Sequence, residues 1–335
     1  MGRFLNVGVI QMPVAADTTE NLRYLQEQLD HLMSTYHRPE LVVGVECLQT
    51  YTPEPLDGPV SDFFADLARQ YGIYFIPGTV YEENEALPSG FYYNSAPVYN
   101  PQGERIAVYR KMAPWRPSEA YAAPGREYVV FEIPEKQTKI GIQICYDLNF
   151  PEISRNETLM GAEVLVKLTM DPQELYELNK HLHYTRALEN QAYLVCTNCV
   201  GVFDGFDTYG HSQVISPEGD LIWEAGSAPS IATVTLDLDL VERVRNYGTR
   251  FMDHYLAHLG EYAFPMPYSD DVKAAPVFET IDSAPKTPDE YERRNRRIGL
   301  QTIGRRQEPQ PDLKRIRKNL DEFLKEKRKP DPCVE

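Results

Sequence analysis

A cysteine that follows an apolar segment is the residue of this 335-residue sequence best suited to nucleophilic chemistry. Cys145 comes directly after KIGIQI (139–144), and a helix is predicted to begin at Pro151. A cysteine at the carboxyl end of a buried strand, followed by a tight turn, exposes its sulfur at the edge of the sheet. The next backbone N–H, that of Tyr146, then points toward an oxyanion formed there. Because only a few per cent of free thiols are ionised near neutrality, such a nucleophile needs activation.

Two other segments hold residues that could supply this activation. Glu46 follows the apolar run LVVGV (41–45), and Lys111 and Glu119 lie in YRKMAPWRPSEAYAAPG (109–125). A carboxylate could take the thiol proton and an ammonium could stabilise the negative charge. Two carboxylates beside a thiol raise its pKa, and the lysine offsets this. Each residue alone also has an ordinary structural interpretation, such as an inert buried cysteine, and spacing alone does not bring them together.

Taken together and in this order, the three segments resemble the nitrilase superfamily of carbon–nitrogen hydrolases. The likeness extends from about Phe4 to about residue 265. It implies an α/β fold, a four-layer α-β-β-α sandwich. It also implies Glu46 as the general base, Lys111 as the oxyanion stabiliser and Cys145 as the nucleophile, with no cofactor and no metal.

The middle segment resembles the corresponding stretch of aliphatic amidases and formamidases. In those enzymes a second glutamate follows the lysine at the spacing seen here, which implies that Glu119 orients the substrate and the lysine. The stretch VFDGFDTYGHS (202–212) also resembles an amidase segment, and RALENQAYLVCTN (186–198) is typical of the superfamily. The sequence departs from the amidase pattern at three positions, and these affect the expected substrate rather than the chemistry. Cys47 stands where an aromatic residue is common, and Arg116 where a small or neutral residue is usual. Tyr146 follows the nucleophile, as in omega-amidase-like branches.

The resemblance predicts a cysteine-dependent amidase that cleaves a small primary amide, an aliphatic amide or formamide, to acid and ammonia through a thioester. The alternative within enzymes is an N-carbamoyl or omega-amide hydrolase, in which Arg116 would bind a substrate carboxylate through two hydrogen bonds. Arg116 could instead pair with a surface acid. Trp115 and Tyr121 could line the substrate pocket or serve as core aromatics. An alternative of another class is a catalytically idle scaffold.

The periodicity of the apolar residues predicts the elements that would position these groups. Helical spacing is seen at 18–36, 60–71, 151–160 and 172–190, and strand-like runs occur at 4–10, 41–45, 73–81, 139–145, 163–168 and 193–200. Two hairpins are predicted, one at 90–109 across Asn100-Pro101-Gln102-Gly103 and one within 210–236. Strands that alternate with helices and read as continuous apolar runs favour an α/β fold with buried sheets.

Composition and charge exclude several classes of protein. The chain is 42% hydrophobic and 25% charged, with a formal charge of −16. This argues against a nucleic-acid or membrane-surface partner. No apolar run is long enough to span a membrane. Five cysteines, an odd number, favour a reducing cytoplasm over a disulfide framework. The pair Cys196 and Cys199 lacks the second such pair that a structural zinc site would need.

The composition changes near residue 285, which divides the chain into a predicted hydrolase domain, 1–285, and a basic extension, 286–335. Residues 286–329 hold 15 Lys/Arg against 8 Asp/Glu. Apolar residues at helical spacing predict a helix there, namely Leu313, Ile316, Leu320, Phe323 and Leu324. The extension could bind RNA or anionic lipid, but the acidic body of the same protein, or a neighbouring subunit, is the favoured surface. The resemblance implies a homo-oligomer built from dimers.

Overall fold

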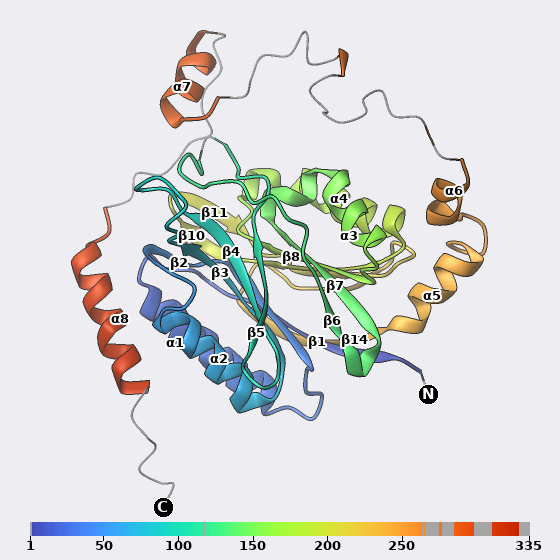
Figure 1. Ribbon diagram of the computed structural model, residues 1–335, viewed down its shortest axis with the longest axis horizontal. Helices are drawn as coiled ribbons and strands as arrows, with labels where there is room; N and C mark the ends of the chain where they lie inside the picture. Colours follow the sequence, from blue (N-terminus) through green and yellow to red (C-terminus); the bar gives the residue numbers. More distant parts are fainter. Residues whose placement is uncertain are drawn as a thin grey trace, which may run out of the picture.

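The computed structural model describes residues 2–116, 118–262, 264, 275–276, 285–297 and 310–327. Within them, two six-stranded sheets pack face to face between two layers of helices (Figure 1). The first sheet has the order β14-β1-β2-β3-β4-β5 and the second β13-β12-β9-β8-β7-β6. The four-layer α-β-β-α sandwich predicted from the sequence is therefore confirmed.

The first sheet is parallel at its centre and antiparallel at its edges. Its strands are β1 (Phe4–Gln11), β2 (Leu41–Glu54), β3 (Tyr74–Glu82), β4 (Tyr93–Tyr99), β5 (Arg105–Arg110) and β14 (Ser230–Asp237). β1 pairs in parallel with β2, and β2 with β3. The start of β2, residues 41–48, is buried throughout. This is the burial expected of a parallel strand covered on both faces.

The second sheet repeats this plan. Its strands are β6 (Val130–Ile133), β7 (Thr138–Ile144), β8 (Val164–Thr169), β9 (Tyr193–Asn198), β12 (Gln213–Ile215) and β13 (Leu221–Glu224). β7, β8 and β9 are parallel. A separate ribbon of β10 (Val200–Phe203) and β11 (Phe206–Tyr209), which the sequence reading did not resolve, lies beyond β9. Short 3₁₀ helices are η1 (Pro134–Lys136), η2 (Cys145–Asn149) and η3 (Gln173–Leu175).

Two helices cover the outer face of each sheet. α1 (Thr18–Met33) and α2 (Pro59–Tyr71) pack on the first sheet, and α3 (Pro151–Leu159) and α4 (Tyr176–Asn190) on the second. α1 begins where Asp17 accepts a hydrogen bond from the Thr19 N–H at 2.9 Å, a capping interaction. α2 ends at Gly72, which adopts a left-handed conformation with φ of 64°. The predicted helices are thus present, with small changes at their ends.

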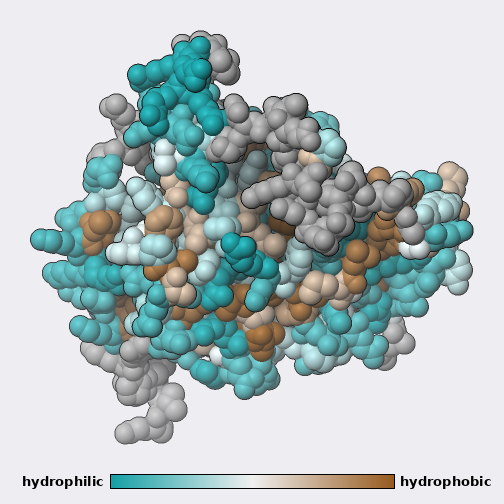
Figure 2. Space-filling model, turned by 45° about the horizontal axis from the view of Figure 1, so that its top comes forward, coloured by the Kyte–Doolittle hydropathy of each residue, from teal (hydrophilic) through white to brown (hydrophobic). Residues whose placement is uncertain are grey.

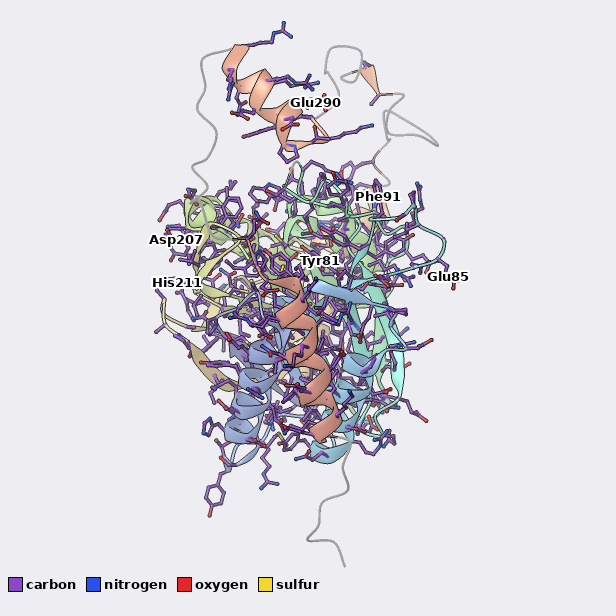
Figure 3. The ribbon with its side chains drawn as sticks, turned by 90° about the vertical axis from the view of Figure 1, so that its left-hand side faces the viewer. Tyr81, Glu85, Phe91, Asp207, His211 and Glu290 are labelled. Atoms are coloured by element: carbon purple, nitrogen blue, oxygen red, sulfur yellow. The ribbon has the colours of Figure 1, made fainter. Side chains whose placement is uncertain are left out.

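The remaining helices are α5 (Leu238–Tyr247), α6 (Tyr255–Tyr262), α7 (Pro288–Arg297) and α8 (Leu313–Lys327). α8 lies against α1 and α2 on the outside of the sandwich (Figures 1 and 3). Its apolar face is buried: Leu320, Phe323 and Leu324 lie in the same core as those helices, and Ile316 is also buried, while Leu313 is exposed. This part of the basic extension therefore adds a helix to the first helical layer of its own chain.

Candidate active site

The nucleophile candidate lies at a sharp turn between β7 and α3. Cys145 directly follows β7 and has a φ of 50°, a left-handed conformation that is rare for a residue with a side chain. The buried Asp147 carboxylate holds the turn, accepting hydrogen bonds from the Ile144 N–H at 3.0 Å and the Ala113 N–H at 2.7 Å. Strained backbone held by surrounding contacts is typical of functional sites. Asp147 therefore fixes the cysteine turn and connects it to the loop that follows Lys111.

Glu46 lies within β2, whereas the sequence reading placed it at the end of the strand. The regular pairing of β2 with β3 is interrupted between Val45 and Gln49, and Cys47 has a φ of 68°. The Cys47 N–H donates to Thr79 Oγ1 at 2.9 Å. The strand continues after this irregularity, which is why the predicted end was wrong. A bulge of this kind re-aims a side chain, here that of Glu46.

Lys111, Glu46 and Glu119 form a buried triad of charges. Lys111 follows β5, and its Nζ lies 2.9 Å from Glu46 Oε1 and 2.8 Å from Glu119 Oε2. The lysine side chain is 2% exposed. Its backbone is fixed on both sides, since its N–H donates to the Asn94 carbonyl and its carbonyl accepts from the Gly125 N–H. The structure thus places these three charged residues together, which their spacing in the sequence did not show.

Asn94 is a member of this cluster that the sequence reading missed. Its Nδ2 donates to Glu46 Oε1 at 2.8 Å and to Glu119 Oε1 at 3.1 Å, and the residue is fully buried. The Met170 N–H completes the surroundings of Glu46 by donating to Oε2 at 2.9 Å. These contacts join strands that are distant in the sequence, and no local pattern marks them.

Burial and charge set the protonation of the three principal groups. Burial, reinforced by the charge of Glu46 and opposed by that of Lys111, raises the pKa of the Cys145 thiol well above its usual value. Burial also raises the pKa of Glu46. Burial alone would lower the pKa of Lys111, but the neighbouring negative charges outweigh it and raise the pKa well above its usual value. The lysine therefore stays charged. Its positive charge only partly counteracts the rise in the pKa of the thiol, so the resting nucleophile is a neutral thiol that needs a base.

A second buried ion pair, Lys167–Asp171, also contacts the nucleophile. The Cys145 Sγ–H donates to Asp171 Oδ1 at 3.4 Å, and Lys167 Nζ lies 2.6 Å from Asp171 Oδ2. Lys167 also contacts His183 Nε2 at 3.1 Å, and the Tyr209 hydroxyl donates to Asp171 Oδ2 at 3.0 Å. The sequence reading did not identify these residues. A lysine inside the apolar strand VLVKLT, four residues before an aspartate, is the signal that could have pointed to them.

The predicted pocket residues have different surroundings. Trp115 packs against Phe206 of β11, with 5.8 Å between ring centroids. Arg116 donates to the backbone carbonyls of Glu119 and Ala122, the latter at 2.8 Å, and so braces its own loop.

Tyr121 is 63% exposed and lies edge-on to Phe91, so it is not a core aromatic. The side chain of Tyr146 packs edge-on to Phe150. The proposed role of the Tyr146 backbone N–H toward an oxyanion stays a prediction.

A loop and a two-stranded ribbon lie on either side of Tyr81. In the view of Figure 3, Tyr81 lies between the loop that carries Glu85 and Phe91 and the ribbon that carries Asp207. Tyr81 stacks on Tyr92 with 3.9 Å between centroids. Burial and the charges of Cys47, Tyr92 and Glu119 raise the pKa of Tyr81 well above its usual value. The stacked tyrosines thus lie close enough to Cys47 and Glu119 to be affected by their charges.

Three further features of the described residues concern metal ions, cysteine pairing and the membrane. No group of three or more His, Cys, Asp or Glu side chains among them could hold a metal ion. Cys196 and Cys199 are free and buried. None of the helices described is both long enough and apolar enough to cross a bilayer.

Comparison with known proteins gives a consistent picture. Residues 6–246 match the family model described as carbon–nitrogen hydrolase. The chain is 30% identical over 261 residues to the Schizosaccharomyces pombe protein named "Probable nitrilase C965.09", covering 74% of this chain and 94% of that protein. It is 27% identical over 319 residues to a formamidase of Bacillus cereus, covering 82% of this chain and 95% of that enzyme.

A third relative and a solved structure extend the comparison. The chain is 28% identical to the omega-amidase NIT2 of Xenopus tropicalis, covering 73% of this chain and 92% of that enzyme. It also superposes on the crystal structure of Nit3 from Saccharomyces cerevisiae, a member of branch 10 of the nitrilase superfamily. The TM-score is 0.67 at 25% identity, covering 73% of this chain and 94% of Nit3.

Proposed function

The chain belongs to the carbon–nitrogen hydrolase family, and we propose that it is a cysteine-dependent amidase that hydrolyses a small primary amide to acid and ammonia. The observation that carries this proposal is the buried Glu46–Lys111–Glu119 cluster beside Cys145. Burying charged groups costs folding free energy, so three charged side chains and a strained cysteine in one buried site favour a catalytic role over an idle scaffold. The formamidase and omega-amidase among its relatives agree with this chemistry.

The first half of the reaction forms a thioester. Glu46 takes the proton of Cys145 as the sulfur attacks the substrate carbonyl, and its raised pKa suits it to this task. The oxyanion then lies between the Lys111 ammonium and the Tyr146 N–H, and one such donor is worth roughly 3 kcal/mol of the barrier. Glu46 returns the proton to the leaving nitrogen, and ammonia departs as the C–N bond breaks.

The second half of the reaction releases the acid. Glu46 accepts a proton from water as the water oxygen attacks the thioester carbonyl, and the C–S bond breaks as Glu46 returns that proton to the sulfur, which regenerates the thiol and releases the acid. Asn94 keeps Glu46 in place by donating a hydrogen bond to it, and Glu119 keeps Lys111 in place by accepting one from it. All steps use groups of this chain and water.

A small neutral amide fits the site better than a carboxylate-bearing one. The Arg116 guanidinium, which the alternative substrate would need, donates to two backbone carbonyls of its own loop. Binding a substrate carboxylate through Arg116 would require those hydrogen bonds to break. The omega-amide or N-carbamoyl alternative is nevertheless supported by the omega-amidase among the relatives and is included in the test.

Ammonia release from a panel of compounds tests the proposal. The panel contains formamide, acetamide, propionamide, a dicarboxylic acid monoamide, an N-carbamoyl amino acid and a simple nitrile, each with wild type and Cys145→Ala. Release from the simple amides that requires Cys145 supports the proposal. Release only from the carboxylate-bearing compounds moves the assignment to the alternative, and no release, with an unreactive Cys145, supports the scaffold.

We further propose that the protein is a cytoplasmic homo-oligomer built from dimers, acting on a small molecule rather than on nucleic acid or a membrane. Exposed apolar side chains near the end of α5 support an interface between copies: Phe251 is 73% exposed and Met252 71%. Figure 2 shows hydrophobic residues among hydrophilic ones on the face it presents. Light scattering of the purified protein gives the mass, and a monomer at all concentrations would contradict the proposal.

A further inference from the structure

The nucleophile hydrogen-bonds to a carboxylate other than the proposed base. The Cys145 Sγ–H donates to Asp171 Oδ1 at 3.4 Å, within the range for a sulfur donor. Asp171 is 3% exposed, and its N–H donates to Asn198 Oδ1 at 2.9 Å. The carboxylate is therefore fixed at both its backbone and its side chain, with one oxygen directed at the reacting sulfur.

We propose that Asp171 is a positioning residue for the nucleophile, holding the Cys145 thiol by a hydrogen bond until Glu46 takes the proton. This inference rests on the proposed function, because it assigns Cys145 the role of the nucleophile. Asp171 keeps no proton in the reaction: it accepts the S–H hydrogen bond, and the proton moves to Glu46 when the sulfur attacks.

The hydrogen bonds that Glu46 already accepts explain why the resting thiol donates to Asp171 instead. Glu46 Oε1 already accepts from Lys111 and Asn94, and Oε2 accepts from the Met170 N–H. A carboxylate has about four lone-pair positions, so one remains to receive a proton. In contrast, Asp171 Oδ2 accepts from Lys167 and Tyr209, which leaves Oδ1 directed at the sulfur.

The surroundings of the two carboxylates suit them to different roles. Burial raises the pKa of Glu46. Burial would also raise the pKa of Asp171, but the charge and hydrogen bond of Lys167 outweigh it and lower the pKa below its usual range. Carboxylates whose environments separate their pKa values commonly divide base and electrostatic roles. Asp171 thus stays ionised as an acceptor, while Glu46 can hold a proton.

His183 accepts a hydrogen bond from the Lys167 ammonium. Because an ammonium has only donors, Lys167 must donate to His183 Nε2, which leaves the proton on Nδ1 to be donated to Gln213 Oε1 at 2.9 Å. Burial and the Lys167 charge lower the pKa of His183 to about 3. The histidine is therefore neutral, and Lys167 remains the single cation that balances Asp171 in this network.

The thiol is faced by charged groups from several elements. They are Glu46 from β2, Lys111 from the segment after β5, Lys167 from β8 and Asp171 from the loop after β8. Asp171 itself faces Lys167, His183 of α4 and Tyr209 of β11. Of the two carboxylates that raise the pKa of the thiol, Asp171 is the one whose removal leaves the Glu46–Lys111–Glu119 cluster intact.

The pH dependence of Cys145 alkylation tests this role without any substrate. Iodoacetamide labelling of Cys145 is followed by peptide mass spectrometry in wild type and Asp171→Asn. Removing the negative charge, and with it the strong carboxylate acceptor, should move the midpoint of the labelling profile to lower pH by about one unit. A role confined to holding β8 and α4 together would change the amount of folded protein but not this midpoint.

Two further variants keep the test decisive. Glu163→Gln removes another salt-bridged carboxylate, one that pairs with Arg3 just before β8 begins, and it should leave the profile at the wild-type position. If Asp171→Asn does not fold because Lys167 is left unpaired, the double variant Lys167→Met/Asp171→Asn removes both charges. It should shift the midpoint in the same direction by a smaller amount, because the loss of the Lys167 charge opposes the larger effect of losing Asp171.

A folded variant lacking Asp171 whose profile superimposes on that of wild type overturns the inference. The amide panel separates this failure from failure of the proposed function. If wild type releases no ammonia from any compound, the proposed function fails, whereas a shifted labelling profile still establishes the contact between Asp171 and the thiol.

Discussion

Lys111 Nζ lies 2.9 Å from Glu46 Oε1 inside the protein, where both side chains are nearly inaccessible to solvent. Two carboxylates share this one ammonium, since Glu119 Oε2 lies 2.8 Å from the same atom. Both carboxyl groups therefore depend on the same cation, and loss of the lysine would leave two buried carboxyl groups close together without it. The stability of the site and its proposed chemistry thus depend on the same residue, Lys111.

Replacing Lys111 should reduce turnover severely. In Lys111→Ala the proposed oxyanion loses its ammonium donor, and kcat should fall by a factor of about 10² to 10³ or more. Steady-state ammonia release measures kcat, and circular dichroism checks that the variant is folded. A folded variant with a rate near that of wild type would remove Lys111 from the mechanism.

Glu119 should control the pH at which Glu46 acts. A general base works when deprotonated, so activity should rise with pH as Glu46 ionises, with its midpoint above the ordinary 4.5 of a glutamic acid. The charge of Glu119 contributes to that raised pKa. Glu119→Gln should therefore move the acid limb of kcat/KM to lower pH, by about one unit. An unmoved limb would mean that Glu46 is not the titrating base.

His183 should make the protein less stable in acid. Its pKa is lowered from 6.5 to about 3 by burial and Lys167, so between these values the unfolded chain binds the proton and the folded one does not. The free energy of unfolding should consequently rise with pH across this window. The contribution amounts to about 2 kcal/mol between pH 5 and 7.

The variant His183→Gln isolates this effect. Chemical denaturation at the two pH values gives the change in unfolding free energy for wild type and variant. Other titrating groups, such as Asp147 with its pKa raised to about 6, are common to both proteins. The difference between the two pH dependences should be about 2 kcal/mol; equal dependences would show that His183 does not carry it.

The outer helix α8 should stabilise the domain on which it lies. Phe323 is 3% exposed and packs edge-on to Phe63 of α2 at 5.5 Å. Phe323→Ala should lower the free energy of unfolding by about 3 kcal/mol. Leu313→Ala, at an exposed position of the same helix, should change it by less than about 0.5 kcal/mol. Equal effects in urea denaturation would mean that α8 does not pack as described.

The sequence indicated those site residues that lie within short contiguous motifs. Cys145 and Lys111 could be proposed as catalytic residues because each lies in a short segment that resembles a motif of a known family. Asn94 and Asp171 could not, because their contacts join strands that only the completed sheets bring together. The position of Glu46 within β2 was also misjudged, since a bulge continues the strand where an apolar run stops. Local patterns predicted the elements, and tertiary pairing completed the site.

The central claim is that Cys145 carries the acyl group as a thioester. The most direct measurement is mass spectrometry of the enzyme quenched during turnover of propionamide, or of whichever panel compound it hydrolyses fastest. We predict an acyl adduct on the peptide that contains Cys145, and neither an adduct nor ammonia release with Cys145→Ala. Ammonia release by Cys145→Ala at the wild-type rate, or an adduct on another residue, would contradict the account.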